Sequence, residues 1–197
     1  ALSKLRALAP DGLCKAFDAG ANGYGRGEGC VAIALKRLSD AVAAGDRIYA
    51  VVKGSAVNHD GHSNGLTAPN GLAQEAVLRA ALAHAGVEAK AVDFVEAHGT
   101  GTLLGDPIEV LALSRVYGKD RVPESPLYLG ALKTNVGHLE GAAGVAGLVK
   151  IALCLQRQQF VPQLHLRQLN PRIPWGDLQV RVSTELRDWP RKEGPRV

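Results

Sequence analysis

Residues 91–102 read Ala-Val-Asp-Phe-Val-Glu-Ala-His-Gly-Thr-Gly-Thr, and residues 127–138 read Leu-Tyr-Leu-Gly-Ala-Leu-Lys-Thr-Asn-Val-Gly-His. In each stretch an apolar run of strand length passes into a glycine-containing loop that holds a histidine, and helix-forming sequence follows. These runs predict strands over 91–96 and 127–132. Because ligands collect beyond the carboxyl ends of strands in α/β sheets, the layout predicts a functional site that contains both histidines.

Strand-like and helix-like segments also alternate on both sides of these stretches, which indicates an α/β fold. Apolar runs predict further strands at 29–35, 49–57 and 179–182. Apolar residues at helical spacing predict helices at 39–44, 72–85, 106–117 and 138–156. The last helix contains Gly141, Gly144 and Gly147, each of which costs about 1 kcal/mol relative to Ala. We therefore expect another part of the chain to approach that helix closely.

The composition excludes several broad classes of protein. With 46% hydrophobic and 21% charged residues among 197, the chain is not disordered. The longest weakly polar stretch, 141–155, is broken by Lys150 and is too short to span a membrane. Aromatic residues make up 5%, and the basic excess lies at the two ends of the chain, so no nucleic-acid surface is indicated. Either a solvated surface or an acidic protein partner would explain the Arg-rich carboxyl-terminal end.

Cysteine and histidine spacing gives no indication of a metal site. Cys14, Cys30 and Cys154 form neither a CxxC pair nor an even disulfide framework, which fits a reducing, cytoplasmic setting. The segment His59-Asp60-Gly61-His62 lacks further ligands at useful spacing, and we interpret it as a turn. The chain begins at Ala1 with no initiator Met and no leader. We interpret it as a segment of a longer polypeptide.

The two predicted loops carry the residue types that stabilise a negatively charged oxygen. Neutral imidazoles of His98 and His138 could together donate hydrogen bonds to one carbonyl oxygen as it becomes an enolate. Lys133 could hold one ring or bias its protonation, and the hydroxyls of Thr100 and Thr102 offer donors to a polar ligand. A structural histidine and a solvated lysine are the plainer alternatives.

The start of the helix at 106–117 has its own pattern. Asp106, Pro107 and Glu109 predict a capping box, in which Asp caps the helix and Glu reaches back to the cap. The loop 64–70 is rich in turn residues and could border a site. The segment from Gly23 to Gly29 looks like a phosphate loop, but it precedes a predicted strand, so the dinucleotide-binding fingerprint fails on context. A Gly-x-Ser-x-Gly pattern is present at residues 61–65, but no predicted strand ends directly before it and no predicted helix begins directly after it, so it does not indicate the nucleophile elbow of a hydrolase.

The two stretches, extended by Gly105-Asp106-Pro107-Ile108-Glu109 and by Leu139-Glu140, resemble the two histidine motifs of β-ketoacyl synthases. Residues 64–70 and 23–29 resemble the type I modular polyketide synthase branch of that family. The resemblance covers about 3–189. It implies a thiolase-like fold of layered α/β/α/β/α character, in the form of a homodimer. It also implies a decarboxylative Claisen condensation between an enzyme-bound acyl group and a malonyl-type extender on an acyl carrier protein.

The resemblance further implies roles for individual residues. His98, His138 and Lys133 would be catalytic, and Thr100 and Thr102 would bind the phosphopantetheine arm delivered by the carrier protein, with no other cofactor and no metal. The supporting residues would be Asn135, Glu140, Asp106 and Glu109. Partners would be the carrier protein, the acyltransferase and the other domains of the same synthase, with neither nucleic acid nor membrane.

Two parts of the family pattern are absent from residues 1–197. The nucleophilic cysteine of a Thr-Ala-Cys-Ser type motif would lie upstream, and the glycine-rich strand with a Phe and half of the oxyanion hole would lie downstream. We therefore expect 1–197 to be a partial ketosynthase domain, mainly its carboxyl-terminal half, that is inactive alone. The alternative is a non-catalytic ketosynthase-like module or chain-length partner that binds acyl carrier protein.

Overall fold

The centre of the molecule is a parallel sheet with strand order β1-β2-β4. The computed structural model describes residues 2–5, 7–63, 65, 68–190 and 194–197. In it, β1 (Phe94–Glu96), β2 (Leu127–Gly130) and β4 (Val180–Val182) lie within the segments predicted as strands. Val95 is paired with Leu129, and Leu129 with Val182. Because β1 and β2 are parallel neighbours, their carboxyl ends meet at one edge of the sheet.

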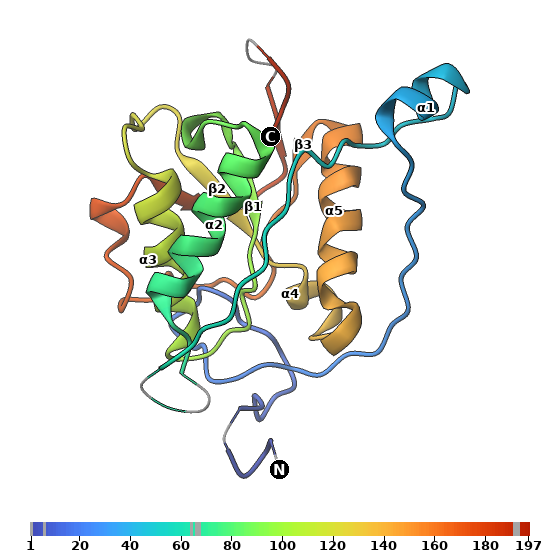
Figure 1. Ribbon diagram of the computed structural model, residues 1–197. Helices are drawn as coiled ribbons and strands as arrows, with labels where there is room; N and C mark the ends of the chain where they lie inside the picture. Colours follow the sequence, from blue (N-terminus) through green and yellow to red (C-terminus); the bar gives the residue numbers. More distant parts are fainter. Residues whose placement is uncertain (1, 6, 64, 66–67, 191–193) are drawn as a thin grey trace.

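Helices lie on both sides of this sheet (Figure 1). α2 (Gly71–Ala85) and α3 (Gly105–Tyr117) pack against each other on one side, and α5 (Ala143–Arg157) lies on the other. Two short elements precede α5, namely α4 (Lys133–Val136) and η2 (Glu140–Ala142). α1 (Leu38–Ala43) lies apart from the sheet on a long connection (Figure 1). The remaining 3-10 turns are η1 (Ala89–Ala91) and η3 (Trp175–Asp177). No helix of the described residues is long and apolar enough to cross a membrane.

Two groups of buried side chains hold these layers together. The larger group joins the sheet to α3 and includes Val110, Leu127, Leu129 and Val180, all at most 1% exposed. The smaller group lies under α5, where Phe160 stacks on Phe94 with ring centroids 5.5 Å apart. Phe160 belongs to β3 (Gln159–Phe160), which pairs with β5 (Arg187–Asp188) in an antiparallel ladder that the sequence did not predict.

The helices predicted at 39–44, 72–85 and 106–117 hold to within one residue at each end, whereas the helix predicted at 138–156 begins only at Ala143 and α4 was not predicted. The side chain of Asn70 accepts the N–H groups of Leu72 and Ala73, and Gly86 ends α2 in the left-handed conformation, as a helix-stopping glycine should. The face of α2 that packs on the core is carried by Leu78 and Leu82, whose long side chains reach the buried cluster.

The predicted strands at 29–35 and 49–57 are wrong for the described structure. Both segments are extended, but neither pairs with a neighbouring backbone there. Apolar side chains along them are exposed, including Ile33, Leu35, Val51 and Val52. A strand needs a hydrogen-bonded partner as well as an apolar pattern, and the pattern alone cannot supply one.

Candidate active site

The two histidines that follow β1 and β2 meet at the common end of these strands. The ring centroids of His98 and His138 are 5.5 Å apart, and the ring planes are inclined by 82°. Both residues line a cavity of about 630 Å³, together with Thr100, Thr102 and Glu109. The expected convergence of the two rings on one cavity therefore describes the structure correctly.

The backbone around His138 fixes the protonated nitrogen of its ring. The N–H of Glu140 donates to Nδ1 of His138 at 3.0 Å, so Nδ1 of the neutral ring is an acceptor and the proton lies on Nε2. The His138 N–H donates to the Gly25 carbonyl at 2.8 Å, and its carbonyl accepts the Gly27 N–H at 3.0 Å. Gly137, with φ of 74°, provides the sharp turn between α4 and His138.

The segment from Gly23 to Gly29 is therefore part of the site, although as a phosphate loop it stands in the wrong context. A Cβ at Gly27 would lie 2.1 Å from the carbonyl oxygen of Val136, so only glycine allows this close approach to α4. Tyr24 lies against the His138 ring with centroids 5.2 Å apart. The glycines at 25 and 27 were the available signal, because a glycine permits a closer approach of another backbone than any other residue does.

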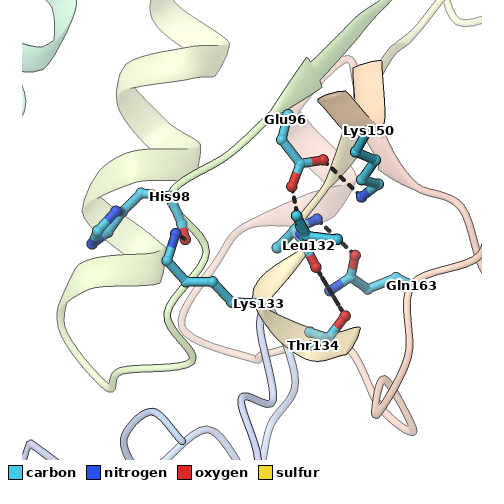
Figure 2. Close-up of polar contacts among 8 residues, drawn as sticks. Glu96, His98, Leu132, Lys133, Thr134, Lys150 and Gln163 are labelled. Carbon is cyan, nitrogen blue, oxygen red and sulfur yellow. Dashed lines mark hydrogen bonds and ion pairs between the residues drawn. The ribbon is translucent and has the colours of Figure 1, made fainter. Parts of the chain in front are cut away.

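Lys133 is a buried residue and not a solvated one. Its side chain reaches across to β1, where Nζ donates to the backbone carbonyl of His98 at 2.7 Å (Figure 2). Burial lowers the pKa of Lys133, while the carboxylates of Glu109 and Glu96 oppose this effect. The lysine therefore fixes the backbone that carries His98, and its contact is with the carbonyl and not with the ring.

The electrostatic environment favours neutral imidazoles. Desolvation, together with the nearby charge of Lys133 and the ring of His138, lowers the pKa of His98 to about 4. His98 still reaches solvent through the cavity. Desolvation and the charge of Lys133 also lower the pKa of His138. Both rings are thus uncharged near pH 7, and each can donate one N–H to a ligand oxygen.

The predicted capping box at Asp106 and Glu109 is wrong. The hydroxyl of Thr102 accepts the N–H of Gly105 at the start of α3. The two carboxylates instead reach away from their own helix. Asp106 accepts the N–H groups of Phe17 and Gly101, at 2.7 and 3.0 Å.

Glu109 accepts two N–H groups of the loop after β1, from His98 at 2.6 Å and from Gly99 at 2.9 Å. Burial raises the pKa of Glu109 to about 7 and that of Asp106 to about 6. The tertiary contacts displaced the local cap because the Gly-rich loop leaves several buried N–H groups that need acceptors. Together the two carboxylates clamp this loop from the side of α3.

The other predicted site residues are placed as follows. The hydroxyls of Thr100 and Thr102 lie 3.3 Å apart on the cavity wall. Glu140 meets His138 through its backbone, while its carboxylate lies 3.7 Å from Nε of Arg26. Asn135 is exposed on α4, and within the described residues no contact of its amide joins it to the site.

The turn-rich loop at 64–70 is only partly described, because residues 64, 66 and 67 lie outside the described part of the chain. Ala68 and Pro69 line the 630 Å³ cavity, as a bordering loop would. At 59–62, His59 accepts the N–H of Gly61, which is the contact of a turn. Among the described residues no group of three metal-ligating side chains is close enough to hold a metal ion.

None of the three cysteines has the environment of an activated nucleophile. Cys14 is buried, and its sulfur accepts the Gly25 N–H at 3.2 Å. Burial raises the pKa of both Cys14 and Cys154, which disfavours the reactive thiolate. Cys30 is exposed on the extended segment before α1.

Comparison with known proteins gives consistent matches over the whole chain. Residues 49–167 match the family "Beta-ketoacyl synthase, C-terminal domain", and residues 1–41 match "Beta-ketoacyl synthase, N-terminal domain". The chain is 55% identical over 190 residues to a phenolphthiocerol/phthiocerol polyketide synthase protein of Mycobacterium tuberculosis, covering 96% of this chain and 10% of that protein. It is 54% identical over 194 residues to a spectinabilin polyketide synthase system protein of Streptomyces orinoci, covering 98% of this chain and 5% of that protein.

Solved structures confirm the fold class. The ketosynthase from module 6 of the bacillaene synthase of Bacillus subtilis superposes with a TM-score of 0.93 at 41% identity, covering 99% of this chain and 35% of that chain. The oxazolomycin ketosynthase domain of Streptomyces albus superposes equally well, at 39% identity, covering 98% of this chain and 34% of that chain. This agreement confirms the expected thiolase-like α/β fold, of which the chain spans about a third. The chain belongs to the β-ketoacyl synthase family, within its polyketide synthase branch.

Proposed function

We propose that residues 1–197 are the two-histidine part of a ketosynthase domain, which extends a polyketide by decarboxylative Claisen condensation. The observation that carries this proposal is the pair of neutral imidazoles, His98 and His138, facing one cavity with ring centroids 5.5 Å apart. In this role the domain is an acyltransferase. The nucleophilic cysteine comes from a part of the domain beyond these residues.

In the proposed reaction the carbonyl oxygen of a malonyl thioester accepts hydrogen bonds from both rings. The bond to the carboxylate breaks, carbon dioxide leaves, and the electron pair forms an enolate whose oxygen the two N–H groups stabilise. The enolate carbon then attacks the carbonyl carbon of the acyl group on the cysteine. A carbon–carbon bond forms, the carbon–sulfur bond breaks, and the cysteine leaves as thiolate.

Neutral rings suit this reaction better than imidazolium ions. A cationic ring would bind the carboxylate of malonate in the ground state, whereas a neutral donor interacts most strongly with the enolate oxygen as its charge develops. The N–H of Glu140 at Nδ1 leaves Nε2 of His138 as the donor. The low pKa of His98 keeps its ring uncharged at the same pH.

The substrate arrives on a partner in this proposal. An acyl carrier protein delivers the extender on its phosphopantetheine arm, to which the hydroxyls of Thr100 and Thr102 donate from the cavity wall. We further propose that the complete domain works as a cytoplasmic homodimer beside the acyltransferase and other domains of one synthase. The non-catalytic alternative has no need for both histidines and is the weaker interpretation.

The proposal is tested by replacing each histidine in the complete synthase. His98→Ala and His138→Ala are each expected to lower decarboxylation of the malonyl carrier protein by about 10²–10³, the usual loss when one donor to an oxyanion is removed. The double variant should lose less than the product of the two single losses, because the two donors act as a unit.

The control is transfer of the acyl group onto the cysteine, measured under single turnover. This step forms no enolate, so it should survive His98→Ala better than decarboxylation does. Parental decarboxylation rates in both single variants would make the histidines structural and would contradict the proposal.

A further inference from the structure

A largely buried ion pair connects the end of β1, just before the His98 loop, with α5. Nζ of Lys150, on α5, is 2.7 Å from Oε2 of Glu96, at the end of β1 (Figure 2). The two side chains are only 10% and 11% exposed. Such a pair adds little net stability, because the desolvation of both charges opposes their attraction. Its presence two residues before His98 calls for a different explanation.

The other oxygen of Glu96 binds the backbone of the second histidine loop. Oε1 accepts the N–H of Leu132, the residue immediately before Lys133 (Figure 2). Glu96 therefore joins three elements, since it lies on β1, pairs with α5 and holds the amino-terminal end of α4. No local sequence rule connects Glu96 with Leu132, because the two residues are 36 positions apart.

A second side chain holds the same turn from the opposite direction. Oε1 of Gln163 accepts the N–H of Ala131 at 2.9 Å, and its Nε2 donates to Oγ1 of Thr134 at 3.2 Å. Consecutive N–H groups, at Ala131 and Leu132, are thus bound by side chains from two distant segments (Figure 2). Lys133 follows these two residues, and its Nζ holds the backbone of His98.

Gly147 and Gly130 lack side chains and therefore make room for the ion pair. A Cβ at Gly147, on α5, would lie 3.2 Å from Cγ of Glu96. A Cβ at Gly130, at the end of β2, would lie 3.0 Å from Nζ of Lys150. The close approach expected at Gly141, Gly144 and Gly147 is therefore found at Gly147, whereas a Cβ at either of the other two would meet nothing within 4 Å in the described part of the chain.

We propose that Glu96, held by Lys150, is a positioning residue that sets the place of Lys133 and thereby the spacing of His98 and His138. This proposal rests on the proposed function of the histidine pair. Glu96 does not touch the reacting atoms in it. The chain of contacts runs from Lys150 through Glu96 to the Leu132 N–H, and from Lys133 to the His98 carbonyl.

The experiment compares Glu96→Ala with Glu96→Gln in the complete synthase, using malonyl carrier protein as the substrate. Glu96→Ala removes the acceptor for the Leu132 N–H, and we expect kcat for decarboxylation to fall by about 10- to 100-fold, the loss typical of a small misplacement. KM should stay nearly unchanged, because substrate binding is not the altered step. Glu96→Gln keeps an acceptor of the same length and should restore most of the rate.

Glu75→Ala is the matched control. The carboxylate of Glu75 is similarly enclosed at 14% exposed and pairs with Arg115 at 3.0 Å, but it lies on α2 away from the histidines. Acyl transfer onto the cysteine is measured for every variant. A positioning role predicts that only decarboxylation falls in Glu96→Ala, and that neither reaction falls in Glu75→Ala.

Equal losses of acyl transfer and decarboxylation in Glu96→Ala would show a general structural role and would overturn the inference, as would an unchanged kcat. Should Glu96→Ala fail to fold, Glu96→Asp replaces it, since the shorter side chain keeps the charge but withdraws the acceptor from Leu132. The same selective loss of kcat is then required. Absence of decarboxylation in the parental synthase would instead refute the proposed function itself.

Discussion

The protonation of His98 is a property of one residue that can be measured directly. Its pKa is lowered to about 4 by desolvation, followed by the charge of Lys133 and the ring of His138. The unfolded chain binds a proton at this residue near pH 6.5 and the folded chain only near pH 4. The folding stability that depends on a neutral His98 is therefore fully present above pH 6.5, and it is lost as the pH falls from 6.5 towards 4.

We expect a nuclear magnetic resonance titration of the complete ketosynthase domain to show the His98 ring neutral down to about pH 4. The spectrum of His98→Ala assigns the resonance. Replacing Lys133 by Met should raise the midpoint, because a neighbouring positive charge disfavours the imidazolium ion. A midpoint near 6.5 in the parental domain would contradict the partial desolvation and the nearby positive charge assigned to this ring.

At the scale of elements, the segments 29–35 and 49–57 carry a strand pattern without a strand partner. The backbone of Tyr49 is held by a side chain, since its carbonyl accepts from Nε2 of Gln156. Figure 1 shows this extended chain running from α1 past α5. A cavity of about 1030 Å³ is lined by Tyr49, Lys53 and Gly54 on one side and by residues of β1 and α5 on the other.

We expect both segments to become paired strands in the complete domain, because the exposed apolar side chains and the backbone groups that lack a strand partner are then satisfied. Amide hydrogen exchange measures the change. Amides of 29–35 and 49–57 should exchange at least about 100-fold more slowly in the complete domain than in the 197-residue chain, as closed ladders do relative to open segments. The amides of β2 provide the reference, since they are already paired in both. Equal exchange rates would count against the partial-domain assignment.

At the scale of the whole molecule, residues 1–197 contain both histidines but no cysteine in a Thr-Ala-Cys-Ser type motif. Cys14 is buried, its sulfur accepts the N–H of Gly25, and burial raises the pKa of its thiol. The 197-residue chain, incubated with acyl and malonyl carrier proteins, is therefore expected to form no condensation product by mass spectrometry. The complete synthase provides the positive control. Clear turnover by the chain alone would require a nucleophile among Cys14, Cys30 and Cys154, which single Cys→Ala variants would identify.

Much of this protein could be predicted from local sequence. The strands that deliver His98 and His138, the helices that follow them and the helix stop at Gly86 all depend on apolar spacing and on glycine, which act within a few residues. Two parallel neighbouring strands necessarily release their loops at the same edge. The meeting of the two histidines therefore needed little more than the pattern of the two stretches.

The partners of the buried polar groups depend on the fold and could not be predicted from local sequence. Asp106 and Glu109 match a capping box in the sequence, yet they bind N–H groups of distant loops. Glu96 reaches Leu132, and the glycine segment at 23–29 packs on α4. The physical reason is that hydrogen bonds and desolvation act over a few ångströms of space, whereas sequence patterns report only neighbours along the chain. Local sequence was thus enough for β1, β2, β4, α2, α3 and the two candidate histidines, whereas three-dimensional packing determined which carboxylates and backbone groups hold the histidines in place.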